Sequence, residues 1–304
     1  MNENITKKEF LLKKFYEKAD KTAEKNKGFY TNPSIARIEP FKIADQLYYV
    51  GDKKVCIHLI DTGDGLILLD SGYFGTAHLL VDSIWRAGFD PKNVRWIIHT
   101  HGHHDHFGAS DEFRIMYGTK LAISRVDAES LRRKPNRAHI NNSIYPYAKI
   151  PDFDYEIEDG EIFKLGNIKI RCVLTPGHTD GVLSLFFEVT DNGKTYLAGM
   201  FGGAGVNAIE LPHLCYNERS KDCAQDMLRS IEKLWDEPVV VHIGNHPYNS
   251  FTMEKRAKQI EEGGNPFVAP DSWHVFLSKL RTVVEKTIIA NEKLEKDISE
   301  LVCE

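Results

Sequence analysis

The sequence predicts a mixed α/β fold, and two observations support that prediction. Short apolar runs typical of strands, such as 94–99 and 168–174, alternate with segments of helical spacing, such as 76–87. The 304 residues are 42% hydrophobic and 27% charged, the mix of an ordinary globular protein with a buried core. This composition excludes a disordered chain, a collagen and a coiled-coil rod as descriptions of the whole molecule.

The first part of the chain is predicted to contain an opening helix, a β-meander and a helix followed by a strand. Residues 5–27 are polar with scattered apolar positions, which predicts an amphipathic helix outside the core domain. Three strands are expected next, and a turn at 61–65 separates the last two. They lie at 41–50, 55–60 and 66–69, followed by the helix 76–87 and the strand 94–99.

The second part continues the alternation of strands and helices. Strands are expected at 120–123, 161–164, 168–174, 183–189, 195–198 and 239–241, with helices near 222–235 and 252–262. No repeat and no linker rich in Gly, Ser or Pro interrupts the pattern. We therefore expect one core domain at 35–270, a helical extension at 1–34 and a C-terminal amphipathic helix at 271–304.

The C-terminal segment repeats its main positions in alternating steps of four and three. They are Trp273, Leu277, Leu280, Val284, Thr287, Asn291, Leu294, Ile298 and Leu301. Such spacing predicts a helix with one continuous seam. Two uses of the seam stay open, namely packing on the chain's own domain or N-terminal helix, and a subunit interface of a homo-oligomer.

Charge, cysteine content and hydropathy narrow the class of partner and the compartment. With 39 Lys and Arg against 44 Asp and Glu, the net charge of −5 disfavours nucleic acid and anionic membranes as partners. No N-terminal signal peptide is evident, and no apolar run approaches the roughly 18 residues of a membrane span. The five cysteines, Cys56, Cys172, Cys215, Cys223 and Cys303, form no CxxC pair. We expect a cytoplasmic protein with free thiols that acts on a small molecule.

A run of histidines follows the predicted strand at 94–99. Residues 101–106, His-Gly-His-His-Asp-His, place five ionisable side chains in six positions. Such groups are costly to bury without partners, and imidazole and carboxylate are ligands of divalent cations such as Zn²⁺. In a loop with alternating side-chain directions, His101 and His103 would face one ion. Asp105 and His106 would then face a second ion about 3.5–4 Å away, with His104 out of phase.

Two metal ions need more ligands than this run supplies, so further ligands must come from distant loops. His178 lies in Thr-Pro-Gly-His-Thr-Asp-Gly, 175–181, directly after the strand 168–174. His242 and His246 follow the strand 239–241 in the same way. Strand ends that meet at one edge of a sheet would bring these side chains together.

Three motifs resemble those of the metallo-β-lactamase superfamily. HGHHDH at 101–106 resembles its HxHxDH motif, and TPGHTDG at 175–181, with Ser184 downstream, resembles its second histidine motif. Leu-Leu-Asp-Ser-Gly at 68–72 resembles its aspartate motif. The similarity covers about residues 37–270. It implies an αββα four-layer sandwich, with the site at one edge of two facing mixed sheets, and a binuclear zinc hydrolase.

Within the superfamily, the chain resembles the third subclass of class B β-lactamases. Most branches have a metal-bridging Asp where this chain has Met200, whose thioether cannot replace a carboxylate for Zn²⁺. The third subclass also lacks that acid and uses a late histidine, which His246 resembles because Pro247 follows it; His242 is the alternative. The third subclass usually has Asp-Ser where this chain has Gly199–Met200. This departure and the absence of an export signal both disfavour β-lactams as the physiological substrate.

The resemblance implies a set of roles for these residues. One zinc ion would be held by His101, His103 and His178, and a second by Asp105, His106 and His246. Asp70 would fix a ligand imidazole or its loop, or alternatively only stabilise its own turn. The two ions would lower the pKa of a shared water toward ~7, and Asp105, as the catalytic residue, would orient the resulting hydroxide.

The leading hypothesis is a zinc-dependent hydrolase that cleaves a small cyclic amide or ester, similar to a β-lactamase. A lactonase or another ester or thioester hydrolase is the alternative within enzymes. A catalytically silent metal-binding oligomeric scaffold or sensor is the alternative from another class, which the complete set of six ligands disfavours. The pocket wall stays open. Six loop residues could line it, but a surface or packing role is favoured for each of them: Tyr145, Tyr147, Phe201, His213, Tyr216 and Arg219.

Overall fold

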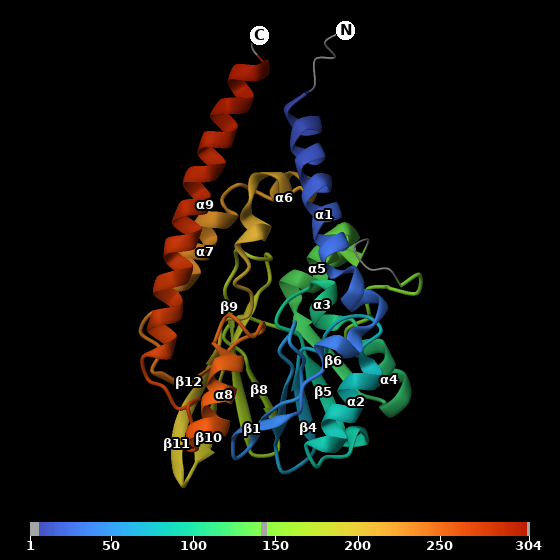
Figure 1. Ribbon diagram of the computed structural model, residues 1–304, viewed down its shortest axis with the longest axis vertical. Coiled ribbons are helices and arrows are strands. Elements are labelled where there is room, and N and C mark those ends of the chain that lie inside the picture. Colours follow the sequence, from blue (N-terminus) through green and yellow to red (C-terminus); the bar gives the residue numbers. More distant parts are fainter. Residues whose placement is uncertain (1–5, 141–144, 303–304) are drawn as a thin grey trace.

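Two β-sheets face each other with helices on their outer sides in the computed structural model, which describes residues 6–140 and 145–302 (Figure 1). The main core lies between the sheets and contains buried residues of both, such as Ile67 and Ile98 from one and Leu185 and Met200 from the other. The expected α/β sandwich is confirmed.

The first sheet has seven strands in sequence order. They are β1 (Phe41–Ala44), β2 (Leu47–Tyr49), β3 (His58–Asp61), β4 (Leu66–Leu69), β5 (Val94–Ile98), β6 (Lys120–Ser124) and β7 (Tyr155–Ile157). β1 to β4 pair antiparallel, and β4 to β7 pair parallel. The prediction of a single strand at 41–50 is wrong, because this segment is the β1–β2 hairpin. Asp45 and Gln46 form its turn, and both residues hydrogen-bond to Thr190.

The second sheet has five strands. Their spatial order is β12 (Val239–Ile243), β11 (Lys194–Met200), β10 (Leu183–Asp191), β9 (Ile168–Leu174) and β8 (Ile162–Leu165). Only the β11–β12 pair is parallel. The strands β4, β5, β9, β11 and β12 are each followed by a loop, whereas β6 leads directly into α5. These segments carry most of the polar residues discussed below.

The described helices surround the sheets. They are α1 (Lys7–Thr31), α2 (Ala77–Arg86), α3 (His104–Phe107), α4 (Ser110–Tyr117), α5 (Arg125–Arg133), α6 (Leu211–Tyr216), α7 (Cys223–Lys233), α8 (Thr252–Glu262) and α9 (Ser272–Val302). The prediction missed α3 to α6 and the short strand β7. α3 corrects the expected alternating loop, because from His104 onward the histidine run is helical and neighbouring side chains no longer point to opposite sides.

The C-terminal seam packs against the chain itself. Trp273, Leu277 and Val284 are buried in a cluster with residues of α7, and Ile298 is buried with Leu11 of α1. Asn291 accepts a hydrogen bond from the Leu211 backbone N–H and donates one to the Ile209 carbonyl. The side chain of Leu301 lies outside the described residues. A homo-oligomer through α9 stays a prediction, and it would have to use surface other than these buried positions.

Within the described residues, the cysteines form no disulfides, and the helices include no membrane-spanning segment. Cys56, Cys172, Cys215 and Cys223 are free, and Cys303 lies outside the described residues. Within 6–140 and 145–302, no helix combines the length and apolar character needed to cross a bilayer.

Candidate metal centre

The first group of candidate ligands comes from the loop after β5 and the turn after β9. His101, His103 and His178 are buried there, with potential ligand atoms within 4.8 Å of one another. The His101 Nδ1–H donates to the Gly202 carbonyl over 3.1 Å, and the His178 Nδ1–H donates to the Gly205 carbonyl over 2.7 Å. These bonds leave each Nε2 as the unprotonated nitrogen. The buried His101 Nε2 has no hydrogen-bond partner among the described residues.

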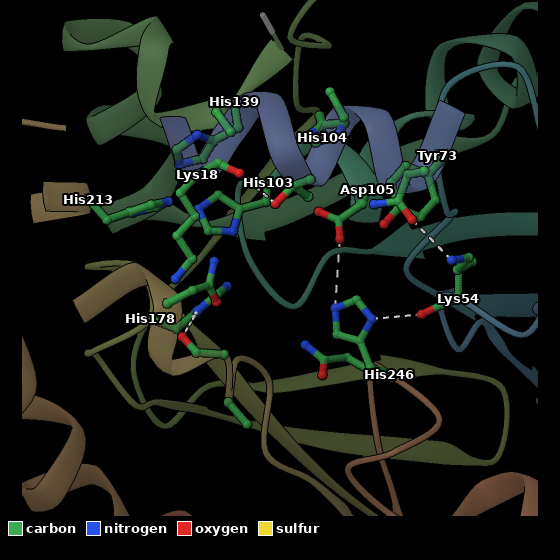
Figure 2. Close-up of a pocket in the computed structure, with 18 of the residues that line it drawn as sticks. Lys18, Lys54, Tyr73, His103, His104, Asp105, His139, His178, His213 and His246 are labelled. Carbon is green, nitrogen blue, oxygen red and sulfur yellow. Dashed lines mark hydrogen bonds and ion pairs between the residues drawn. The ribbon is translucent and has the colours of Figure 1, made fainter. Parts of the chain in front are cut away.

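The second group lies next to the first and combines one carboxylate with two imidazoles. Asp105 Oδ2 lies 3.6 Å from His106 Nε2 and 3.7 Å from His246 Nε2. Both separations are too long for hydrogen bonds. The His246 Nδ1–H donates to the Lys54 carbonyl over 2.8 Å, which turns Nε2 toward Asp105 (Figure 2). His106 Nε2 is buried without a partner among the described residues, and such an orphaned nitrogen beside a carboxylate fits a cation between them.

Asp70 connects the ends of β4 and β5 and fixes one imidazole of the second group. Its buried carboxylate accepts hydrogen bonds from His106 Nδ1 over 2.7 Å, from the Thr100 backbone N–H over 2.7 Å and from the Thr100 hydroxyl over 2.9 Å. Its φ of 62° is in the left-handed region, which an aspartate tolerates better than most residues. Asp70 therefore fixes the His106 ring and the backbone at Thr100, while its support of a bound metal stays a prediction.

Protonation states in both groups suit a divalent cation, with His106 as the exception. Burial lowers the pKa of His178 to about 3, and burial together with neighbouring imidazoles lowers the pKa values of His101 and His103. For Asp105, burial raises the pKa, but the adjacent imidazoles outweigh it and hold the pKa below its usual range. His106 differs, because Asp105 and Asp70 outweigh burial and raise its pKa. Neutral imidazoles and an ionised carboxylate are the forms that bind metal.

The alternative ligand His242 lies away from both groups. Its Nδ1 is 3.2 Å from the Ser272 hydroxyl, and its ring packs against Trp273 and Phe276. His104 also belongs to neither group, and Met200 is buried in the core between the sheets.

The support roles of two residues were not predicted from the sequence, although Arg219 was among the loop residues considered for the pocket wall. Asp127, in the first turn of α5, accepts bonds of 2.8 Å each from the Gly102 and Gly181 backbone N–H groups and the Thr179 hydroxyl, which joins the two histidine motifs. The Arg219 guanidinium donates to the Gly177 and His178 carbonyls over 2.8 and 2.7 Å. Neither residue lies in a recognisable motif, so only the tertiary contacts reveal them.

Both ligand groups open into one cavity of about 420 Å³. The helix α1 covers this cavity and contributes Phe15, Lys18, Ala19, Thr22, Ala23, Asn26 and Tyr30 to its wall (Figure 2). Phe15 stacks on Tyr216 with 3.9 Å between ring centroids, and Lys54 donates to Asn26 over 3.1 Å. The extension predicted to lie outside the core domain is therefore a wall of the candidate site.

Of the six loop residues considered for the pocket wall, some contribute to the cavity and others do not. His213 lines the cavity, while Tyr216 supports Phe15 and Arg219 supports the turn of His178. The others are packing or surface residues with respect to this cavity: Phe201 is buried in a core cluster, Tyr147 is exposed and the Tyr145 hydroxyl donates to the Tyr30 carbonyl.

Comparisons with known proteins agree with this arrangement. Residues 51–192 match the family model of the metallo-beta-lactamase superfamily. The native FEZ-1 metallo-beta-lactamase from Legionella gormanii superposes with a TM-score of 0.77 at 26% identity, over 84% of this chain and 98% of that one. BJP-1, a subclass B3 metallo-beta-lactamase of Bradyrhizobium japonicum, gives a TM-score of 0.74 at 24% identity over 85% and 97% of the two chains, a likeness of fold.

Curated relatives match over a shorter stretch. An N-acyl homoserine lactonase of Bacillus thuringiensis is 26% identical over 168 residues, 47% of this chain and 62% of the lactonase. A probable metallo-hydrolase of Burkholderia pseudomallei is 31% identical over 146 residues, 39% of this chain and 45% of that protein. The chain thus matches less than two thirds of the length of these relatives. The family-model match covers just under half of the chain, and together with the sandwich fold shared with FEZ-1 it shows that the chain resembles the metallo-beta-lactamase superfamily.

Proposed function

We propose that the protein is a zinc-dependent hydrolase that cleaves a small cyclic amide or ester, as a β-lactamase does. The observation that supports this most strongly is the convergence of two three-ligand groups on one cavity, with orphaned Nε2 atoms on His101 and His106. Imidazole nitrogens with one carboxylate suit Zn²⁺ better than Mg²⁺ or Ca²⁺, which prefer oxygen ligands.

The proposed ligands divide as the two groups do. His101, His103 and His178 would hold one zinc ion, and Asp105, His106 and His246 the other. When bound, two zinc ions supply an acidified water and a Lewis acid for a carbonyl. Asp105 contributes an ionised carboxylate oxygen that orients a nucleophile, while Asp70 keeps His106 Nδ1 protonated and its ring fixed.

Other residues around the cavity would bind substrate and restrict water. The Tyr248 hydroxyl keeps its proton at neutral pH, because the ordinary pKa of a tyrosine hydroxyl is about 10. It is therefore a hydrogen-bond donor in the wall beside His246. The helix α1 narrows the cavity, which favours a small substrate over a polymer.

Two substrate classes follow from the relatives, in order of support. The late histidine His246 and the absence of an acid at Met200 favour a β-lactamase-like reaction, in line with the similarity to FEZ-1. The match to the N-acyl homoserine lactonase supports a lactonase as the second candidate. A small molecule is the proposed partner in both cases, with no nucleic acid or membrane, in the cytoplasm.

The decisive experiment combines metal analysis with turnover on one preparation. Zinc-loaded protein is assayed with a β-lactam, an N-acyl homoserine lactone, a thioester and a phosphodiester. We expect about two zinc ions per chain and hydrolysis of one of the first two substrates, lost in His178→Ala and kept in His274→Ala, an exposed histidine outside the site. Full zinc occupancy with no carbonyl hydrolysis would instead favour the catalytically silent scaffold. Sedimentation would then measure its oligomeric state.

A further inference from the structure

Two imidazoles that are not candidate metal ligands form the cavity wall beside the first ligand group. His139 follows α5 and His213 lies in α6, and their ring centroids are 4.6 Å apart. The His139 ring is 4.9 Å from that of His103. Both rings line the same cavity as His178, and Figure 2 shows them on the side of the pocket where Lys18 projects from α1.

A single buried amide determines which ring nitrogens carry hydrogen. Asn217 Nδ2 lies 3.2 Å from His139 Nε2 and 3.1 Å from His213 Nδ1. An amide NH₂ has two hydrogens and donates one to each ring. Each ring therefore accepts at the nitrogen facing Asn217 and carries its own hydrogen on the other, His139 Nδ1 and His213 Nε2. Across the described residues, neither of these nitrogens has a hydrogen-bond partner in the protein. Neither is among the fully buried polar atoms that lack a partner.

The two donors are held in place before any ligand binds. His139 has a φ of 57°, in the left-handed region, a strained conformation for a residue with a side chain. Arg137 fixes the adjacent backbone by donating to the Asn217 carbonyl over 3.0 Å and to the Glu218 carbonyl over 2.9 Å. The segments that carry His139 and Asn217 are thus tied directly together, and backbone strain of this kind is typical of binding sites.

Charge on this side of the cavity favours an anion. Lys18 lines the cavity from α1, and its ammonium donates to Glu210 Oε1 over 2.7 Å, so it already holds a carboxylate at the edge of α6. Among the described lining residues, Asp105 is the single carboxylate, and it belongs to the second ligand group. Two N–H donors therefore face a ligand beside Lys18, whose acidic partner Glu210 is not among the described residues that line the cavity.

We propose that His139, His213 and Lys18 form a carboxylate-binding subsite, so that the substrate carries a carboxylate next to the bond that is cleaved. The two imidazole N–H groups donate to the carboxylate oxygens, and Lys18 supplies the opposite charge. The inference deepens the proposed function and rests on it for the identity of the scissile bond, whereas recognition of the carboxylate needs no turnover.

Binding of a matched pair of probes tests the subsite. Calorimetry on zinc-loaded protein compares phenylacetylglycine, which has a carboxylate, with phenylacetylglycinamide, which is neutral. We expect the acid to bind at least about 10-fold more tightly. His213→Phe keeps a ring against Phe15 but removes the N–H, and it should abolish that preference, while His213→Gln, which retains an N–H, should restore part of it. Lys18→Gln should weaken acid binding, and Lys21→Gln, exposed on the same helix, should not.

Two results would overturn the subsite: equal loss of acid and amide binding in His213→Phe, or no preference for the acid in the unaltered protein. A second readout is independent of metal and turnover. Nitrogen-15 NMR of labelled histidines should show hydrogen on His139 Nδ1 and His213 Nε2, and the opposite tautomers would contradict the inference. If the protein binds the acid more tightly than the amide but hydrolyses no carbonyl substrate, the proposed function alone is refuted. If His213→Phe hydrolyses a carboxylate-bearing substrate as fast as the unaltered protein does, the subsite alone is refuted.

Discussion

At the scale of single residues, the candidate centre depends on hydrogen bonds that orient four of its imidazoles, those of His101, His106, His178 and His246. Backbone carbonyls of Gly202, Gly205 and Lys54 accept from three of the rings, and Asp70 accepts from His106. Partners of this kind fix the tautomer and the ring direction of a metal ligand. These four imidazoles therefore need little rearrangement to take up ions.

Replacing Asp70 with Asn tests this support. Asparagine tolerates the left-handed φ of 62° and keeps the size of the side chain, but one of its two oxygens becomes a nitrogen that cannot accept. We expect roughly 10- to 100-fold weaker zinc binding at the second site, with the first site unchanged, in a stepwise titration against a chromophoric chelator. Asp64→Asn, in an exposed turn, is the control. An unchanged second site would show that Asp70 only stabilises its turn.

Loss of one ligand gives a second residue-scale prediction. His246→Ala removes one imidazole from the Asp105 group and leaves the three histidines of the other group intact. Elemental analysis should find about one zinc ion per chain in place of two, and His274→Ala should keep two. Retention of both ions in His246→Ala would remove His246 from the ligand set.

The buried His58 predicts how stability depends on pH. It hydrogen-bonds to the Gly244 carbonyl over 2.9 Å, and burial lowers its pKa from 6.5 to about 4. Below pH 6.5 the unfolded chain binds a proton there while the folded chain does not until about pH 4, so stability falls as pH falls through this window. Urea unfolding at pH 7 and pH 5 should show a smaller acid loss in His58→Gln than in the unaltered protein. The exposed His78→Gln should behave like the unaltered protein.

At the scale of elements, α1 lies outside the two sheets and forms one wall of the cavity. Its contacts include the Phe15 stack on Tyr216, the Lys18–Glu210 ion pair and packing of Leu11 against Leu211 and Ile298. Few of its residues are buried, namely Leu11, Phe15 and Phe29. The helix is therefore expected to open more readily than the sheets.

Phe15→Ala should loosen this wall without unfolding the sandwich. Removing the ring deletes the stack on Tyr216 and the edge contact with His213. We expect faster hydrogen exchange throughout α1, unchanged exchange in β5 and β9, and a higher KM for any small substrate. Lys13→Ala, exposed on the same helix, should match the unaltered protein. Faster exchange in all strands as well would mean that α1 is part of the main cooperative unit.

At the scale of the whole molecule, metal ions would connect loops from both sheets. His101 and Asp105 follow β5 of the first sheet, whereas His178 and His246 follow β9 and β12 of the second. A ligand that binds only the folded chain stabilises it, by about 2.7 kcal/mol for each site at 100 times the dissociation constant. Chelation should therefore lower the melting temperature by more than about 5 °C. The double variant His178→Ala, His246→Ala should melt at one temperature with or without zinc.

The sequence by itself determined the sandwich class and the six candidate ligands, because metal chemistry requires rare residue types at fixed places after apolar strands. HGHHDH, TPGHTDG and the histidine before Pro247 could be recognised without coordinates. Local spacing failed for the hairpin at 41–49, since the turn at Asp45 and Gln46 is held by the distant Thr190.

Only the tertiary structure decided what surrounds the ligands. It placed α1 over the cavity, and it brought Asp127, His139 and Asn217 to the site from separate segments. These residues carry no pattern of their own, because their roles arise from contacts between segments far apart in the chain. The physical reason is that ligand type is a local chemical property, whereas the direction of a ring, the enclosure of a cavity and the partner of a helix are set by packing.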